Sequence, residues 1–228
     1  MEIVLVRHGE PEWVRDGLNV VDPPLTERGL RQAQCVADAL GDEEFDEIVI
    51  SPLRRPRLTA APLLTKRSAD EVIEPFLEEI REPNWHGTPV ELARKAYEEE
   101  RSRVAAARWE GVVGGEASRD FVERVRAGLT EFLAARGVYR TKQILPVWHL
   151  DQSDRRIVVF AHAGTNGVLL CHLLGLDPVP WEWDRFVTGH ASITRLNSLQ
   201  MGDGHTFSLT KLSDVEHLAI DDRTGLLG

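Results

Sequence analysis

The chain has 228 residues, 42% of them hydrophobic and 28% charged, a composition typical of a globular domain that buries a sizeable core. Its formal net charge of −10 argues against a general nucleic-acid binder, which needs a basic face. An anionic substrate would therefore need a locally positive pocket. No apolar run approaches the roughly 20 residues that span a bilayer, so we expect no membrane association.

The cysteines and the N-terminus both indicate the cellular compartment. Cys35 and Cys171 lie in apolar helical patterns without metal-ligand spacing, and we expect both to be buried free thiols. The N-terminus begins a strand at once, without a basic leader or a cleavage site. These features favour a cytoplasmic protein.

One strand and one helix are predicted before residue 41. Residues 2–7 are predicted to form a buried strand, because residues 3–6 are a continuous apolar run, and the strand ends at His8. After a polar loop, Thr26 is expected to cap a helix that stops at Gly41. The apolar positions at helical spacing are Leu30, Ala33, Ala37 and Leu40.

Strand and helix patterns alternate up to residue 73 and then change. A second apolar strand covers residues 46–51, a helix covers 58–64 and a short strand covers 72–73. From 83 to 115, glycines and prolines frame helical pieces around residues 93–108. We expect this stretch to leave the main sheet as a small helical cap.

The second half of the chain continues the alternation of helices and strands and ends with two strands of another kind. Ser118 is expected to cap a helix, and an apolar strand at residues 156–161 ends at His162, before another helix. Residues 192–199 and 206–212 alternate like half-exposed antiparallel strands.

This order of elements predicts a single α/β domain over residues 1–228, with a mixed, mostly parallel sheet and helices on both faces. The link at 138–155 is interpreted as a surface loop, with a lid or a dimer contact as alternatives. Trp181 and Trp183 are assigned either to packing at a helix end or to the rim of a pocket or interface.

Two of the apolar strands end in a histidine. His8 follows Arg7 at the end of the first strand, and His162 follows the strand at 156–161. Ligands of open α/β sheets bind beyond the carboxyl ends of the strands. Both histidines are therefore expected at the edge of the sheet where a ligand would lie.

Three arginines follow the strand at 46–51 and reach the same edge. Arg54, Arg55 and Arg57 lie within four positions, which on an acidic chain indicates a local anion site. A solvated basic helix start is the alternative for Arg54 or Arg57 alone. Arginine suits phosphate because its planar fork binds two oxygens at once and stays charged.

The order of short motifs resembles that of the histidine phosphatase superfamily, which includes phosphoglycerate mutases and many phosphomonoesterases. The resemblance runs from residue 2 to about residue 196, most of the chain. The matching segments, in chain order, are Arg7-His8-Gly9-Glu10, Leu25-Thr26-Glu27-Arg28-Gly29, Ser51-x-Leu53-x-Arg55, Leu77–Ile80 followed by Trp85-x-Gly87, Gly114-Gly115-Glu116-x-Ser118, Ala161-His162-Ala163-Gly164, and Ser192–Leu196.

The resemblance implies that His8 attacks phosphorus and carries the phosphoryl group. Arg7, Arg55 and His162 would hold the phosphate, as expected for a reaction that depends on positioning and charge stabilisation. The other ring nitrogen of His8 needs an acceptor, and we expect a backbone carbonyl of the following turn. The helix after His162 is expected to point free N–H groups at the phosphate.

The resemblance also implies that Glu79 donates and later accepts the catalytic proton, and spacing favours it over Glu78. Burial near a phosphate should raise its pKa. Ala163, where the family commonly has glycine, is expected to tighten the substrate pocket. Glu10 is expected either to select against a second acidic group on the substrate or to be a solvated loop charge.

We therefore expect a phosphomonoester hydrolase for a small phosphorylated metabolite, working without metal or other cofactor. The residues 79–115 are few for a mutase cap, but a cofactor-dependent phosphoglycerate mutase is the alternative within the family. An alternative of another class is a phospholigand-binding module without turnover. A homodimer is expected on base rates alone.

Overall fold

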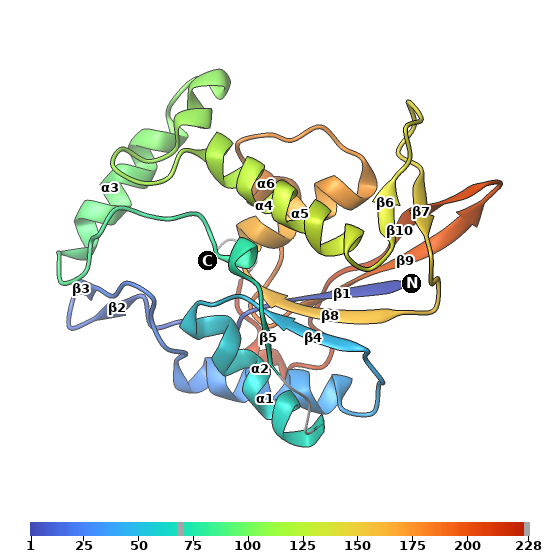
Figure 1. Ribbon diagram of the computed structural model, residues 1–228. Helices are drawn as coiled ribbons and strands as arrows, with labels where there is room; N and C mark the ends of the chain where they lie inside the picture. The colour runs from blue at the N-terminus through green and yellow to red at the C-terminus, as the bar shows by residue number, and fades with distance from the viewer. Residues whose placement is uncertain (68–70, 226–228) are drawn as a thin grey trace.

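The computed structural model describes residues 1–67 and 71–225. Its described part centres on an eight-stranded mixed sheet with helices on both faces, which confirms the predicted fold class (Figure 1). The strands lie in the order β5-β4-β8-β1-β9-β10-β7-β6.

One half of the sheet is parallel and brings three predicted strands together. β1 (Glu2–Arg7) pairs with β8 (Arg156–Ala161), which pairs with β4 (Glu47–Ile50), and β5 (Val72–Ile73) lies outside β4. All four strands run in the same direction, so their carboxyl ends meet at one edge. This edge carries the residues that follow β1, β4 and β8.

The other half of the sheet is antiparallel. β9 (Ile193–Met201) pairs with β1, and β10 (Gly204–Asp214) pairs with β9. The segment interpreted as a surface loop instead contains two strands, β6 (Val138–Arg140) and β7 (Trp148–Leu150), which extend this half. That interpretation was wrong because Trp148 is buried in the core.

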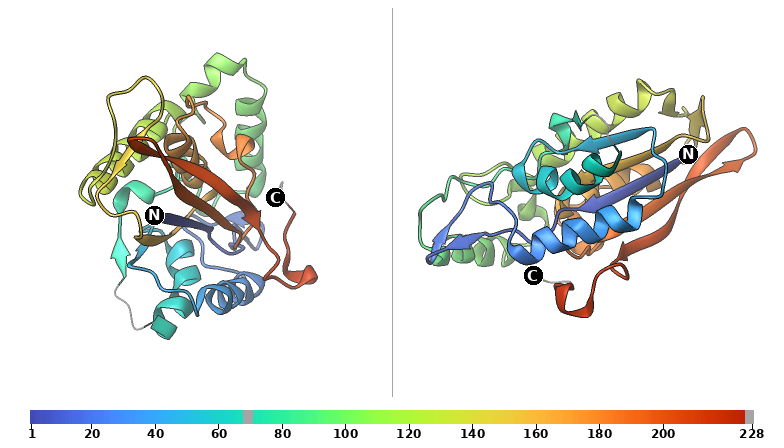
Figure 2. Two further views of the ribbon diagram at one scale, coloured as in Figure 1. Left: turned by 90° about the vertical axis from the view of Figure 1, so that its right-hand side faces the viewer. Right: turned by 90° about the horizontal axis from the view of Figure 1, so that it is seen from below.

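The helices cover the two faces of the sheet (Figure 2). α1 (Glu27–Leu40) and α2 (Arg54–Arg67) lie on one face, and α4 (Ser118–Ala134) and α5 (Ala163–Leu174) lie on the other. Successive residues of β1 point to opposite faces. Val4 and Val6 therefore join the core under α1 and α2, and Ile3 and Leu5 join the core under α4 and α5.

The helix starts refine the sequence predictions. Thr26 caps α1 as predicted, accepting the N–H of Gly29 at 3.0 Å. Leu30, predicted on the buried face, is 51% exposed because it lies beside the buried stripe. Ser118 was predicted as a cap but is the first residue of α4, after the cap position Ala117.

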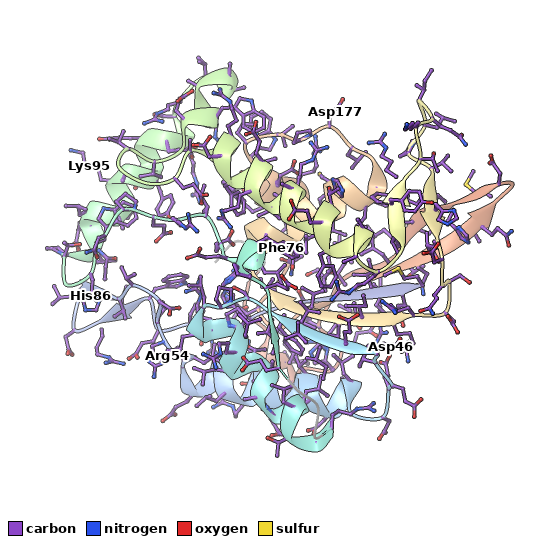
Figure 3. The ribbon with its side chains drawn as sticks, viewed as in Figure 1. Asp46, Arg54, Phe76, His86, Lys95 and Asp177 are labelled. Atoms are coloured by element: carbon purple, nitrogen blue, oxygen red, sulfur yellow. The ribbon has the colours of Figure 1, made fainter. Side chains whose placement is uncertain are left out.

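α2 begins at Arg54, four residues before the predicted start, so its first turn carries the arginine cluster (Figure 3). This early start follows from the end of β4 at Ile50, only a short turn away. The cluster is thereby fixed on a helix at the edge of the sheet where the parallel strands end.

Residues 83–115, here called the cap, lie beyond the carboxyl ends of the parallel strands (Figure 1). They contain α3 (Val90–Arg101) and the 3-10 helix η2 (Ala105–Glu110), neither of which joins the sheet. The hairpin of β2 (Val14–Arg15) and β3 (Leu18–Asn19) supports the start of α3, because Asn19 Nδ2 donates to the Pro89 carbonyl at 2.9 Å.

Both cysteines are free thiols, and Cys171 is buried as expected, whereas Cys35 is partly exposed. Over the described ranges, none of the helices combines the length and the apolar character needed to cross a membrane.

Candidate active site

His8 lies directly after β1, at the edge where the parallel strands end. Its backbone N–H donates to the Ala161 carbonyl at 3.0 Å, and its carbonyl accepts the N–H of Ala191 at 3.1 Å. The ring Nδ1 lies 2.8 Å from the Gly9 carbonyl oxygen. A carbonyl only accepts hydrogen bonds, so Nδ1 carries the proton and Nε2 keeps its lone pair. The expected acceptor in the following turn is confirmed.

The turn after His8 is held by buried polar side chains. Gly9 N–H donates to Thr59 Oγ1 at 3.0 Å, and Glu10 N–H donates to Gln32 Oε1 at 2.7 Å. A Cβ at position 9 would lie 2.7 Å from the Gly29 carbonyl oxygen, so only glycine lets this turn pack against α1. The His8 ring is thereby fixed from both flanking helices.

Arg7 enters the site from the last position of β1. Its guanidinium donates to the Thr188 carbonyl and, through Nη2, to His190 Nε2 at 3.1 Å. Its Nε is buried and has no hydrogen-bond partner among the described residues. The Arg7 side chain also lines the cavity described below, where its positive charge is suited to an anionic ligand.

Arg55 enters from the first turn of α2 and meets His162. Its Nη2 lies 3.2 Å from His162 Nδ1, its Nη1 lies 3.4 Å from Asp22, and the Trp13 ring stacks over it at 4.6 Å. Guanidinium can only donate, so His162 Nδ1 accepts. His162 Nε2 then donates to Ser51 Oγ at 2.8 Å.

His162 lies in the layer behind Arg55. Its ring centre is 5.1 Å from that of His8, but the side chain is fully buried and does not line the cavity described below. Like that of Arg7, the Nε of Arg55 is buried without a partner in the described ranges. The structure therefore brings the four predicted residues together, with His162 orienting Arg55.

The site concentrates positive charge in a buried place. Burial, followed by the Arg55 charge, lowers the pKa of both His8 and His162 well below the ordinary value, so both rings stay neutral. Burial lowers the pKa of Arg7 to about 10, and Arg55 adds to this effect. Arg7 still carries its charge at neutral pH, so the cluster is suited to bind an anion.

Glu79 lies across the site, two residues after the 3-10 helix η1 (Pro75–Leu77). Its Oε2 accepts the N–H of Gly164 at 3.0 Å, and its Oε1 accepts the N–H of Ile80 at 3.0 Å. Burial raises the pKa of Glu79, although these N–H groups and the two arginines oppose the shift. The expected direction of the shift is confirmed.

The neighbouring Glu78 is used differently. It pairs with Arg81 at 2.7 Å near the surface. The structure thus distinguishes Glu79 at the site from Glu78 near the surface, two candidates between which motif spacing gave only a small preference. The N-terminus of α5 also differs from expectation, because the Gly164 N–H is taken by Glu79 instead of being free for phosphate.

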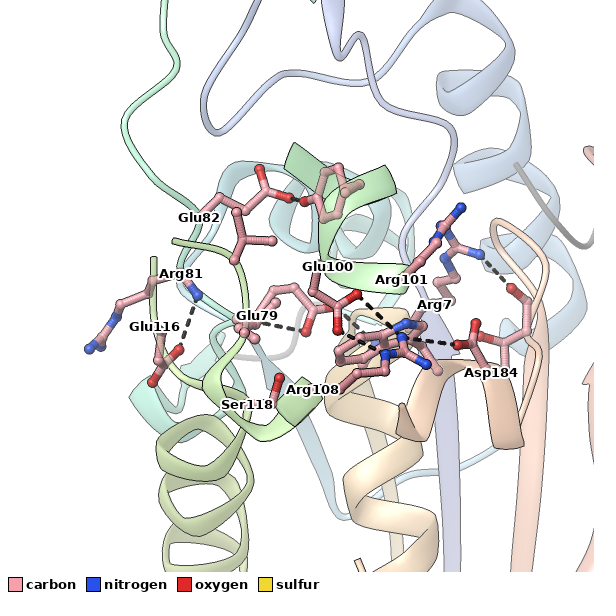
Figure 4. Close-up of a pocket in the computed structure, with 18 of the residues that line it drawn as sticks. Arg7, Glu79, Arg81, Glu82, Glu100, Arg101, Arg108, Glu116, Ser118 and Asp184 are labelled. Carbon is pink, nitrogen blue, oxygen red and sulfur yellow. Dashed lines mark hydrogen bonds and ion pairs between the residues drawn. The ribbon is translucent and has the colours of Figure 1, made fainter. Parts of the chain in front are cut away.

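A cavity of about 690 Å³ lies above this cluster and extends under the cap (Figure 4). Its sheet side is formed by Arg7, His8, Arg55, Glu79, Ala163 and Gly164, and its cap side includes Tyr97, Glu100, Arg101 and Arg108. Ala163 is therefore at the cavity, as predicted for a substrate-binding position. The volume lies within the range typical of small-molecule sites.

Glu10 is not brought to the cavity. Its carboxylate accepts hydrogen bonds from Thr26 Oγ1 at 2.7 Å and from Arg28 Nη1 at 3.1 Å, which holds it against the start of α1. It is absent from the cavity lining. Of the two expectations for Glu10, this arrangement fits neither substrate selection nor a freely solvated charge.

A buried ion pair inside the cap lies next to α6 (Glu182–Arg185). Arg108 Nε donates to Glu100 Oε1 at 2.8 Å, and Arg108 also lies 3.7 Å from Asp184 (Figure 4). The Arg108 guanidinium lies over the Trp181 ring at 5.3 Å, and Trp183 lines the cavity. Of the alternatives for these tryptophans, the pocket rim applies to Trp183.

Glu82 adds a second carboxyl group at the mouth of the cavity. Tyr97 donates a hydrogen bond to it from the cap. Loss of solvation raises the pKa of Glu82 to about 7. The charge of Arg55 opposes this shift, and the charge of Glu79 adds to it. This group changes charge close to neutral pH.

Sequence reasoning missed His190, whose ring centre is 5.7 Å from that of His8. It lies just before β9, which runs antiparallel to β1, so the start of β9 meets the end of β1. The predicted antiparallel strand at 192–199 would have indicated this position only together with its pairing to β1, because an antiparallel neighbour of β1 brings its amino end to this edge. Among residues 1–67 and 71–225, no cluster of three or more potential ligand side chains is arranged for a metal ion.

The sequence matches the histidine phosphatase superfamily (branch 1) over residues 3–212. This match spans most of a chain whose fold places two arginines and a histidine at one sheet edge. The chain belongs to the histidine phosphatase superfamily, branch 1.

Several named proteins are similar to this chain. Phosphoserine phosphatase 1 of Hydrogenobacter thermophilus is 32% identical over 180 residues, which is 78% of each chain. A probable phosphoglycerate mutase GpmB of Proteus mirabilis is 27% identical over 224 residues, 96% of this chain and 95% of that one. A mycobacterial glucosyl-3-phosphoglycerate phosphatase, solved with VO3, has a TM-score of 0.69 and 27% identity, covering 93% of this chain and 98% of its own.

Proposed function

We propose that this protein is a metal-independent phosphatase that transfers the phosphoryl group of a small metabolite to His8 and then to water. The observation that carries the proposal is the buried His8 ring, with its proton held on Nδ1 by Gly9 and its Nε2 lone pair beside two incompletely partnered arginines. A neutral nucleophile next to fixed cations is suited to phosphoryl transfer.

The first proposed step forms a bond between His8 Nε2 and phosphorus and breaks the bond between phosphorus and the ester oxygen. Arg7 and Arg55 stabilise the charge on the non-bridging oxygens. Glu79, protonated because burial raises its pKa, donates its proton to the leaving alkoxide. The products are an alcohol, a phosphohistidine and the Glu79 carboxylate.

The second step reverses these roles. The Glu79 carboxylate takes a proton from water, whose oxygen attacks phosphorus while the phosphorus–nitrogen bond breaks. Inorganic phosphate leaves, and Glu79 is protonated again. The proton stays on His8 Nδ1 throughout, donated in a hydrogen bond to the Gly9 carbonyl, which keeps the ring oriented.

The substrate class is a phosphate monoester of a small polar metabolite. Relatives named for phosphoserine and for glucosyl-3-phosphoglycerate support this class. The cavity of about 690 Å³ leaves room beyond the phosphate for a group of that size. Charged residues on its cap side are suited to polar rather than apolar substituents.

Turnover of an aryl phosphate by wild type and by His8→Ala tests the proposal. We expect phosphate release by the wild type, loss of it in His8→Ala, and no loss in His149→Ala, a surface histidine on β7. A rapid quench with labelled substrate should give an acid-labile, alkali-stable phosphoprotein. Turnover that persists in His8→Ala contradicts the proposal.

Two further outcomes separate the alternatives. Phosphoglycerate interconversion that depends on a bisphosphate primer would identify a mutase, the activity named for the Proteus mirabilis relative. Phosphate binding by calorimetry without turnover of any of a panel of phosphomonoesters would identify a binding module. We also propose a cytoplasmic location, supported by the two free cysteines, whereas a homodimer stays a prediction.

A further inference from the structure

We propose that His190 is a positioning residue for Arg7 and that the C-terminal segment, residues 220–225, holds it in place. The inference rests on the phosphatase activity proposed above, because Arg7 is one of the two arginines assigned there to the phosphate. It concerns a residue that lies behind Arg7 and outside the cavity lining.

The contact between His190 and Arg7 defines the state of the ring. Arg7 Nη2 lies 3.1 Å from His190 Nε2, and because guanidinium only donates, Nε2 must be unprotonated. His190 Nδ1 then carries the proton and donates it to Thr224 Oγ1 at 2.9 Å. The His190 side chain is buried.

Burial and the Arg7 charge together keep this ring neutral, lowering the pKa of His190 to about 3. A neutral ring is required for the proposed role, since an imidazolium would have no acceptor nitrogen and would repel the guanidinium. The acceptor fixes one edge of the Arg7 fork, while the Thr188 carbonyl accepts from Nη1. The Arg7 side chain held by these two contacts lines the cavity.

The other arginine of the site is held in the same way. His162 Nδ1 accepts from Arg55, and its opposite nitrogen donates to the hydroxyl of Ser51. Each arginine thus has a neutral, buried histidine as its acceptor, and each histidine donates to a hydroxyl from its other ring nitrogen. The two histidines use opposite ring nitrogens, and they lie at the ends of β8 and β9, on opposite sides of β1.

The C-terminal segment supplies the hydroxyl for His190 and is itself anchored. It contains the 3-10 helix η3 (Ile220–Asp222), where the Asp222 carbonyl accepts from Gln32 Nε2 at 2.7 Å. The same Gln32 side chain accepts the backbone N–H of Glu10 at 2.7 Å. Arg31 adds an ion pair to Asp222 at 2.7 Å. The segment is therefore braced on the element that also holds the turn after His8.

Kinetics of three variants test the role. In His190→Ala, we expect kcat/KM for an aryl phosphate to fall by about 10- to 100-fold, the loss typical of one hydrogen bond to a buried charge. His190→Gln, which keeps an acceptor oxygen near Nε2, should recover part of that loss. His172→Ala is the matched control, because His172 is a partly buried histidine that contacts Thr130 instead.

Thr224→Val tests the link to the C-terminal segment. It removes a neutral hydrogen bond and should reduce kcat/KM by about 2- to 10-fold. We also expect the dissociation constant for inorganic phosphate, measured by calorimetry, to rise in both variants, and by more in His190→Ala than in Thr224→Val. This binding measurement needs no turnover.

Nitrogen-15 NMR of the wild type gives a signature that a purely structural role would not. We expect His190 to be neutral with its proton on Nδ1 at pH 7, and His162 to be neutral with its proton on Nε2. A His190 proton on Nε2, or a His190→Ala variant that binds phosphate as the wild type does, overturns the inference. Absent turnover in a wild type that binds phosphate and shows these tautomers would instead count against the proposed phosphatase activity alone.

Discussion

The carboxylate of Glu79 lies against the N-terminus of α5, where its Oε2 accepts the backbone N–H of Gly164 at 3.0 Å. A Cβ at position 164 would lie only 2.5 Å from Oε1 of the same carboxylate. The helix that begins after His162 therefore positions the proposed acid as well. Burial favours the neutral form of Glu79, while the dipole of α5 and the Gly164 N–H favour the charged form. A group balanced in this way can exchange its proton during turnover.

Gly164→Ala should displace the Glu79 carboxylate and reduce kcat by about 100-fold, because a misplacement near 1 Å has effects of that size. Steady-state kinetics of Gly164→Ala, Glu79→Gln and the double variant measure this. If the added methyl acts through Glu79, the double variant will be scarcely slower than Glu79→Gln. An equal further loss in both backgrounds would show that the methyl acts elsewhere.

Glu79→Gln should slow substrates in proportion to their need for a proton on the leaving group. With an alkyl phosphate, we expect a loss of about 100-fold or more, the usual contribution of a general acid. With p-nitrophenyl phosphate, whose leaving group needs no proton, the loss in the phosphorylation step should be much smaller. Glu78→Gln is the matched control and should leave both rates near those of the wild type. Equal losses on the two substrates would remove Glu79 from the acid role.

The pH profile should fall on its alkaline side. The pKa of His8 is lowered well below its ordinary value by burial and Arg55, so the ring stays a neutral nucleophile into acidic solution. The pKa of Glu79 is raised by burial, and its protonated form is the one that donates. Activity is therefore expected to decrease as the pH rises through the pKa of Glu79.

The same profile in Glu79→Gln provides the check. A glutamine does not titrate, so the alkaline decrease in kcat/KM for the alkyl phosphate should disappear. A decrease that persists unchanged would assign it to another group. Glu82→Gln is then the next variant, since the pKa of Glu82 is raised to about 7.

Glu100→Gln should loosen the cap. The side chains of Glu100 and Arg108 are 7% and 15% exposed, and their ion pair connects α3 with η2 beside the cavity. Weakening it should cost about 1–3 kcal/mol of local stability. Hydrogen exchange of the α3 amides measures this directly. The control is Glu98→Gln on the same helix, whose pair with Arg94 is 3.9 Å long and exposed. Equal protection in both variants would show that the pair does not hold the cap.

Local patterns predicted the parallel strands β1, β4, β5 and β8, the pair β9 and β10, most helices and the main residues of the site. They did not predict β2, β3, β6 or β7. Apolar runs that end in His8 and His162 predicted two strands of one sheet, which the structure pairs in parallel, and Arg55 after a third strand completed the cluster. These predictions succeeded because parallel strands bring their carboxyl ends to one edge whatever their order. Glu79 depended on the motif resemblance, since its own surroundings in sequence are a run of acidic residues from 74 to 82.

The tertiary structure decided what depends on pairing between distant segments. The amino end of β9 lies beside β1 only because the two strands are antiparallel, and this placement brings His190 to Arg7. Periodicity does not reveal strand order, so neither this contact nor the role of residues 138–150 in the sheet was visible in the chain. The sequence by itself determined which groups could perform the chemistry. Packing alone determined that Gly164, Ser51 and Thr224 orient them, because a hydrogen bond's partner is set by distance in space and not along the chain.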